Sequence, residues 1–166
     1  MISALAGVVM RRDLVVDGFA FGRVTIAGDD ATDEILSMYS SLKRDDVVCI
    51  MIGGLVISMY NIIDGEKLNS ETGIPVIAVT YEESQGLESS ITGRFQNWEA
   101  KIALYEKLGP REKLVLRTGK TIFVRCWGTS QKQAISVLNS FTLQGSLPEP
   151  VRVARLAART LSTTML

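Results

Sequence analysis

The sequence predicts a single α/β domain spanning residues 1–166, with a mixed β-sheet flanked by helices. Two strand-like segments come first along the chain, and strand-like and helix-like segments alternate after them. Antiparallel strands followed by this alternation are typical of a mixed sheet covered on both faces. A length of 166 residues is sufficient for one hydrophobic core, and a hydrophobic fraction of 46% is ordinary for a globular domain.

The first half of the chain contains the predicted antiparallel pair. "SALAGVVMR" and "FAFGRVTIAG" favour two strands, with Asp17 and Gly18 as the expected turn between them. "DATDEILSMYSSLKR" has helical spacing, and "DVVCIMIGG" is a continuous apolar run typical of a buried parallel strand. We expect a helix or broken helix over 55–73, ended by Gly73.

The second half predicts two further strand regions and three helices. "IPVIAVTY" favours a strand, and 83–109 favours a loop and a helix. "KLVLRTGKTIFVRCWG" indicates a β-hairpin turning near Gly119. The remaining helices are expected over 130–141, with Thr129 or Ser130 as the N-cap, and from Val151 to about Leu161.

Composition narrows the possible chemistry and location. Lys plus Arg and Asp plus Glu number 18 each, so binding to nucleic acid would need a local basic patch. The absence of histidine excludes histidine-based triads and imidazole bases. Cys49 and Cys126 lie in apolar runs and favour buried thiols in a reducing environment. The sequence carries no signal-peptide pattern or membrane-length apolar run, so we predict a cytoplasmic protein with no membrane partner.

"DDATDE" places four carboxylates within six positions, between a predicted strand and a predicted helix. Asp29 or Asp30 is expected to cap the helix, with Asp33 and Glu34 near its positive end. Alternatively, one carboxylate faces a divalent cation, whose charge would offset the mutual repulsion of the acids. The two interpretations are compatible, because one acid can cap while another binds.

Two further groups are candidates for binding. Gly53 and Gly54 end a predicted parallel strand, which is where α/β proteins place their ligands. Asn61 and Asp64 are polar residues that follow in an apolar run, and they either satisfy the neighbouring backbone or contribute to a site. Arg152, Arg155 and Arg159 share one face of the last predicted helix, as a solvated face or as a phosphate-contacting ridge.

Four stretches together resemble the archaeal endonuclease dU family, which is related to endonuclease V. They are "DGFAFGRVTIAGDDAT", "GGLVISMYNIID", "TGIPVIAVT" and "PEPVRVARLAA", in the same order and across nearly the whole chain. The resemblance implies an RNase H-like fold. It also implies an endonuclease dependent on Mg²⁺ or Mn²⁺ that acts on deoxyuridine, or other deaminated bases, in DNA.

The resemblance also implies roles for individual residues. Asp30 matches an aspartate of the family and is expected to be catalytic and to bind metal, as is Asp64. Asn61, Gly53, Gly54, Arg152 and Arg155 are expected to contact substrate or phosphate.

The chain departs from the family in three places. Longer members carry an additional first strand with an "IDDG" motif, Gly53 stands where members often have aspartate, and Arg155 stands where many have histidine. These departures remove two expected metal ligands. The alternative function is therefore a non-catalytic relative that binds nucleic acid through Arg152, Arg155 and Arg159. The missing strand would leave sheet edges unpaired, and a homodimer covering them is expected.

Overall fold

The computed structural model describes residues 1–164 and begins with an antiparallel pair of strands. β1 (Ile2–Met10) pairs with β2 (Val16–Thr25) in a register that places Ile2 opposite Thr25 and Val9 opposite Gly18. The turn therefore lies at 11–15, and the expected turn at Asp17 and Gly18 is wrong. A backbone hydrogen bond from Arg11 to Val15 (2.9 Å) closes the connection, and Leu14 supplies the left-handed residue at φ 68°.

A second sheet has the strand order β3-β6-β8-β7. The bounds of its strands are β3 Ile50–Ile52, β6 Val76–Thr80, β7 Glu112–Val115 and β8 Thr121–Trp127. β3 runs parallel to β6, as the apolar run "DVVCIMIGG" predicts, and the other pairs are antiparallel. β3 is shorter than the predicted strand because residues 47–49 have no strand partner. The β7–β8 turn lies at Gly119 (φ +82°), which confirms the predicted hairpin.

The expected helix over 55–73 is only partly present. Residues 55–64 contain a small hairpin of β4 (Val56–Ile57) and β5 (Asn61–Ile62), and the helix α2 occupies Gly65–Thr72. Ser58, Met59 and Tyr60 all have positive φ, so the chain reverses here where a helix would continue. Gly73 ends α2 in the left-handed conformation, as predicted.

The described residues contain five more helices, and their bounds are α1 Ala31–Ser41, α3 Glu88–Thr92, α4 Trp98–Lys107, α5 Gln131–Phe141 and α6 Glu149–Thr164. Ser130 and Gln133 form a capping box at the start of α5, which confirms Ser130 as the N-cap. The segment 83–109 contains two helices instead of one, and α6 starts two residues before the predicted Val151. None of the helices within residues 1–164 has the length and apolar character needed to cross a membrane.

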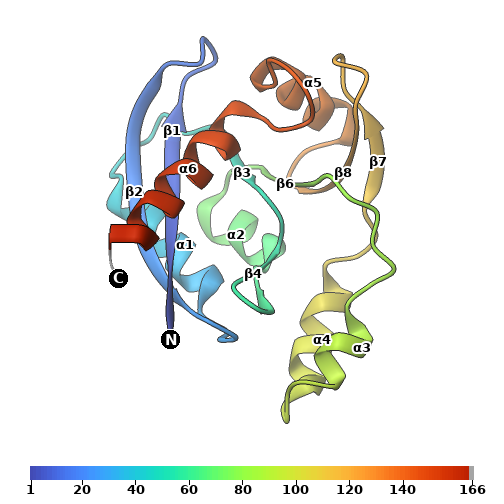
Figure 1. The fold of residues 1–166 in the computed structure, drawn as a ribbon. Helices are drawn as coiled ribbons and strands as arrows, with labels where there is room; N and C mark the ends of the chain where they lie inside the picture. The colour runs from blue at the N-terminus through green and yellow to red at the C-terminus, as the bar shows by residue number, and fades with distance from the viewer. Residues whose placement is uncertain (165–166) are drawn as a thin grey trace.

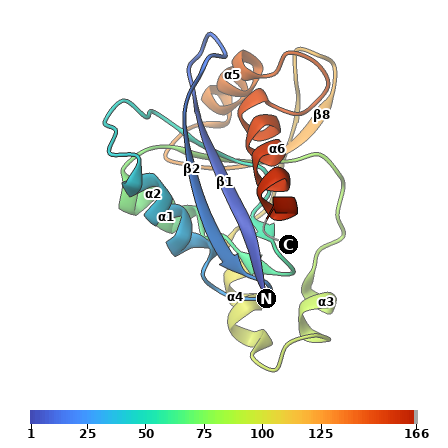
Figure 2. The ribbon, with the colours of Figure 1, turned by 60° about the vertical axis from the view of Figure 1, so that its left-hand side comes forward.

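The helices enclose the first strand pair on both faces. α1 lies on one face of β1 and β2, and α6 crosses the other face beside β1 (Figures 1 and 2). The mixed sheet flanked by helices confirms the predicted fold class. The sheet is divided into two parts, however, because the pair β1–β2 forms no hydrogen-bonded ladder with β3.

The buried side chains form two apolar clusters. One joins β2 to α1 and α2 through Val24, Ala31 and Leu68. The other joins β6 and β8 to α5 through Val79, Val124 and Leu138. Trp127 packs against the first cluster and lies over Gly65, where a β-carbon would overlap its ring. Trp127 is therefore part of the packing around α2.

Candidate functional site

Every carboxylate of the "DDATDE" cluster has a partner within the protein. Asp29 forms an ion pair with Lys101 (2.6 Å), and Asp33 forms one with Lys67 (2.7 Å). Glu34 accepts a hydrogen bond from the backbone of Arg23 (3.0 Å). Asp30 is held by uncharged donors. The repulsion expected among these acids is thus offset at each position by a different neighbour.

Asp30 lies at the centre of a closed hydrogen-bond network with Thr25 and Asn61. Its carboxylate accepts bonds from the Thr25 amide (3.1 Å), the Thr25 hydroxyl (2.7 Å) and Asn61 Nδ2 (2.7 Å). The Thr25 hydroxyl bond is the main cause that holds the pKa of Asp30 below its usual value. Desolvation, the next largest effect, raises the pKa, and the bonds from Asn61 and the Thr25 amide lower it again. Asp30 therefore stays ionised.

Asn61, from β5, connects this network to the start of α1. Its side chain is completely buried (0% exposed), and its Oδ1 accepts a hydrogen bond from the amide of Ala31 (3.1 Å). Its Nδ2 also donates to the carbonyl of Thr25 (2.9 Å). Asp30 is the N-cap residue of α1, as predicted, but its carboxylate makes no capping hydrogen bond to the helix. The Asp30 side chain turns back to Thr25 of β2, so Asn61 and not Asp30 accepts the hydrogen bond of the first helical amide, that of Ala31.

Asp64 is the N-cap of α2, where its carboxylate accepts from the amide of Lys67 (3.0 Å). Its other oxygen binds Lys107 Nζ from α4 (2.9 Å), and its side chain is 15% exposed. Desolvation raises the pKa of Asp64, but the bonds from the Lys67 amide and from Lys107 outweigh it, and the net direction is down. The backbone amide of Asp64 donates to Thr32 (2.9 Å), which joins α2 to the first turn of α1.

The glycines and arginines form a second group, at the carboxyl end of β3. Gly53 lies against α6, since a β-carbon there would meet Val151 at 2.6 Å and the guanidinium of Arg155 at 3.4 Å. Gly54 has φ +91°, a conformation that favours glycine. Arg155 lies over the ring of Tyr81 (5.4 Å) and forms no ion pair with a described carboxylate. Arg152 is bound to Glu149 (2.6 Å).

The predicted site residues thus fall into two groups. Asp30 and Asn61 touch each other, and Asp64 lies in the same region through α1 and α2. Gly53 approaches Arg155 in the second group. Among residues 1–164, no hydrogen bond or ion pair connects the two groups.

Asp30 and Asp64 would have to exchange protein donors for a divalent cation in order to bind one. Mg²⁺ needs oxygen ligands with free lone pairs in near-octahedral geometry. The oxygens of Asp30 already face the donors of Thr25 and Asn61, and Asp64 faces an ammonium group. Within residues 1–164, no three acidic or thiol side chains converge as metal ligands. The expectation that Asp30 and Asp64 bind metal stays a prediction.

Sequence reasoning missed two partners of this region, Lys101 and Thr25. Lys101 is 3% exposed and donates to Asp29, to the carbonyl of Gly28 (2.8 Å) and to the carbonyl of Tyr60 (3.0 Å). It ties the loop before α1 to the left-handed turn at 58–60. No sequence periodicity distinguishes Lys101 from an exposed helical lysine. Thr25 lies only five residues before Asp30, so its closeness in sequence could have identified it as a partner.

The fold is that of endonuclease V, an RNase H-like architecture. A Ciona intestinalis endonuclease V, solved in complex with a 24mer DNA containing an inosine, superposes with TM-score 0.62 at 13% identity over 99% of this chain and 81% of that chain. A crystallised Archaeoglobus fulgidus protein of unknown function gives TM-score 0.80 at 26% identity, covering 95% of this chain and 89% of that chain.

Sequence comparison is more specific than the fold. The profile described as endonuclease dU matches residues 2–162. A UPF0215 protein of Pyrobaculum calidifontis is 37% identical over 157 residues, covering 94% of this chain and 86% of its own length. A Thermococcus kodakarensis UPF0215 protein is 31% identical over 161 residues, covering 96% and 81%. The chain belongs to the endonuclease dU family, and the family resemblance of its four motifs is confirmed.

Proposed function

We propose that this protein is an endonuclease that acts on deoxyuridine, or other deaminated bases, in DNA. The observation that carries the proposal is the match of the endonuclease dU profile to residues 2–162. The endonuclease V structure with inosine-containing DNA supports it, because inosine is also a deaminated base. A deaminated base pairs more weakly and is extruded at lower cost, which gives an enzyme a physical basis for selecting it.

Arg155 is our proposed phosphate contact. Its guanidinium has no carboxylate partner among the described residues, and it lies beside Gly53 and Gly54, whose missing side chains let a backbone approach closely. A guanidinium can form two parallel hydrogen bonds to a phosphate. Arg152 is the weaker candidate, because Glu149 already neutralises it.

Asp30, Asp64 and Asn61 are proposed to support this chemistry. Asp30 and Asp64 remain the candidate catalytic carboxylates, since hydrogen bonding keeps the pKa of each low and therefore keeps it ionised at neutral pH. Asn61 positions Asp30 through its 2.7 Å hydrogen bond. A requirement for Mg²⁺ or Mn²⁺ belongs to the proposal and is tested directly below.

The second candidate is a relative that binds nucleic acid without cleaving it. The observation that favours it is the commitment of Asp30 to Thr25 and Asn61 and of Asp64 to Lys107. Such a protein would bind DNA without a divalent cation and with strong salt dependence.

The test is a nicking assay on a fluorescent duplex with a single deoxyuridine, beside the same duplex with thymidine. Each is incubated with Mg²⁺, Mn²⁺ or EDTA, and binding is measured on the same samples at two salt concentrations. Cleavage of only the deoxyuridine duplex, lost in EDTA, supports the enzyme. Binding without cleavage in ample Mn²⁺ supports the binding protein, and neither cleavage nor binding contradicts both.

Arg155 has a matched control on its own helix. Arg159 lies four residues further along α6 and is exposed. Arg155→Gln is expected to weaken DNA binding about tenfold, as the loss of one charge-assisted phosphate contact, while Arg159→Gln has a smaller effect. Equal effects of the two substitutions would remove Arg155 from the proposed site.

A further inference from the structure

The strand β2 has a sequence that reads almost the same in both directions. Its residues Val16–Val24 are "VDGFAFGRV", which is symmetric about Ala20 except that Asp17 is mirrored by Arg23. If two copies of this strand run antiparallel with Ala20 opposite Ala20, each residue meets its mirror image, and the two unlike residues meet as an acid and a base. Among the described residues β2 is hydrogen-bonded only to β1, so its outer edge has no partner strand.

Side chains close this outer edge of β2 at both ends but not at its centre. In an antiparallel ladder, every second residue directs its N–H and C=O away from the partner strand. The outward amide of Arg23 donates to Glu34 (3.0 Å), and the carbonyl of Asp17 accepts from an arginine that follows α1 (3.2 Å). Phe19 and Phe21 lie between these two positions, and no side chain within residues 1–164 binds their outward backbone groups. The open part of the edge is therefore the centre of the symmetric sequence.

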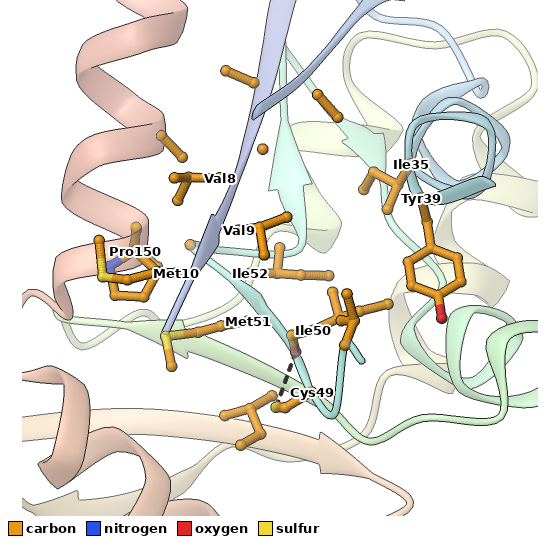
Figure 3. Close-up of a pocket in the computed structure, with 18 of the residues that line it drawn as sticks. Val8, Val9, Met10, Ile35, Tyr39, Cys49, Ile50, Met51, Ile52 and Pro150 are labelled. Carbon is orange, nitrogen blue, oxygen red and sulfur yellow. Dashed lines mark hydrogen bonds between the residues drawn. The ribbon is translucent and has the colours of Figure 1, made fainter. Parts of the chain in front are cut away.

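Phe19 and Phe21 are exposed because α6, the helix on their face of the strand pair, lies over β1 (Figure 2). In the cavity beside β1, Figure 3 shows Val8 on the side of α6 and Val9 on the opposite side. Phe19 is opposite Val8 in the ladder, so both phenylalanines share the face of α6. They are 44% and 54% exposed, with stacked rings 5.7 Å apart between centroids. Together they leave about 200 Å² of aromatic surface in water.

The charges at the two ends of the open edge favour a second copy of the chain over nucleic acid. Arg23 is exposed and forms no ion pair within residues 1–164. Asp17 binds Arg44 through Oδ2 (2.6 Å), and no described residue binds its Oδ1. A phosphate backbone would need several unpaired cations and would be repelled by Asp17. In the antiparallel pair, each Arg23 lies across from Asp17 of the other copy, and the charges are complementary.

We propose that the outer edge of β2 pairs with the same edge of a second copy of this chain, antiparallel and with Ala20 opposite Ala20. Phe19 of each copy would exchange two main-chain hydrogen bonds with Phe21 of the other. The phenylalanine rings of both copies would pack together on one face. Such an interface is the same patch on both copies, as a twofold dimer requires. It uses neither the edges of β1 and β3 nor a residue proposed to contact DNA, so it is independent of whether the protein cleaves DNA.

Analytical ultracentrifugation of the whole chain measures this association. A small interface is expected to give a weak dimer, so the protein concentration should run from roughly 1 µM to 1 mM. The wild type is expected to pass from monomer to dimer in that range, and Phe21→Ser should weaken the dimer at least tenfold. Val115→Ser is the matched control, because Val115 is also an exposed apolar residue on a strand with an open edge, β7. This control should dimerise as the wild type does.

Arg23→Glu tests the register of the pair. It places a glutamate across from Asp17 of the second copy and should weaken the dimer about tenfold, with a smaller effect at high salt because the repulsion is screened. Lys132→Glu makes the same change of charge at an exposed position of α5 and should leave the dimer unchanged.

Amide hydrogen exchange on the unmodified protein identifies the edge directly. Association should slow exchange at least tenfold at Phe19 and Phe21, whose amides point away from β1. The amide of Ala20, between them, points toward β1 in the ladder and should change much less. A dimer through another surface would not produce this alternation.

Several results would overturn the proposal. These are a monomer at every concentration, a dimer that Val115→Ser weakens as much as Phe21→Ser, or a dimer in which the Phe19 and Phe21 amides exchange as fast as in the monomer. A monomer in which single-stranded DNA protects these two amides would also overturn it, since nucleic acid would then be the occupant. If Phe21→Ser does not fold, Arg23→Glu and hydrogen exchange on the wild type still decide the result.

Discussion

Asn61→Ala tests whether the acidic region is held by one buried amide. The substitution removes the bonds of Asn61 to the Ala31 amide (3.1 Å), the Thr25 carbonyl (2.9 Å) and the Asp30 carboxylate (2.7 Å). A neutral hydrogen bond contributes about 1 kcal/mol and one to a charged group about 2 kcal/mol, so the expected loss is about 4 kcal/mol. This is a large part of the stability of an ordinary domain.

Urea unfolding, followed by tryptophan fluorescence and circular dichroism, measures that loss. With a slope of about 2 kcal/mol per molar urea, the midpoint should fall by about 2 M. Asn69→Ala is the matched control, because Asn69 donates one side-chain bond, to the Ile74 carbonyl (2.9 Å), and should lose only about 1 kcal/mol. Equal losses in the two variants would refute the reasoning.

Asn61→Asp separates the polar contribution from packing. It keeps the size of the side chain but places a second carboxylate against Asp30. Like charges in one site raise the pKa of one partner, so this variant should regain stability as the pH falls and one carboxyl group becomes protonated. A variant that instead loses stability steadily with falling pH would contradict the close contact of residues 61 and 30.

Three further predictions concern the same region and one helix start. The folded-state pKa of Asp30 is lowered, so the contribution of Asp30 to folding stability is present above its unfolded pKa and is lost as the pH falls through its folded pKa. Below about pH 4, the wild type should therefore lose stability more steeply than Asp30→Asn in acid titrations of unfolding. Asp45→Asn, at an exposed position, should follow the wild type. Lys101→Met should cost about 3 kcal/mol, because two partly buried carbonyls and Asp29 lose a charged donor, and a loss under 1 kcal/mol in urea unfolding would be inconsistent with the buried position of Lys101. Ser130→Ala should cost about 1 kcal/mol through loss of the capping box, and calorimetry showing no change would contradict the cap.

The elements predicted correctly are those whose signals are local. The "TGK" turn of the second hairpin, Gly73 at the end of α2 and Ser130 with Gln133 at the start of α5 each act within a few residues. The segment 55–64 was mistaken for part of a helix because its apolar run also suits a short hairpin. The left-handed residues 58–60 that separate the two are ordinary residues without a turn signal.

The site was less predictable because its partners are distant in sequence. Asp29 meets Lys101, 72 positions away, and Ala31 meets Asn61, 30 positions away. The sequence shows four clustered acids, but it does not show which base or amide neutralises each one. Gly53 and Arg155 approach each other only because α6 crosses β3.

Among the described residues, β1 and β3 each have one edge without a partner strand. The expected homodimer stays a prediction, and analytical ultracentrifugation of the purified protein would test it.

The measurement that tests the proposed function and its site most directly compares nicking of the deoxyuridine duplex in Mn²⁺ by the wild type, Asp30→Asn and Asp33→Asn. Asp33 belongs to the same acidic cluster but is exposed, and Lys67 is its only ion-pair partner among residues 1–164. Wild type and Asp33→Asn are expected to cut the duplex at similar rates, whereas Asp30→Asn, while still folded, is expected to cut it at least a hundredfold more slowly. Equal rates in all three proteins, or no cutting by the wild type, would contradict this expectation.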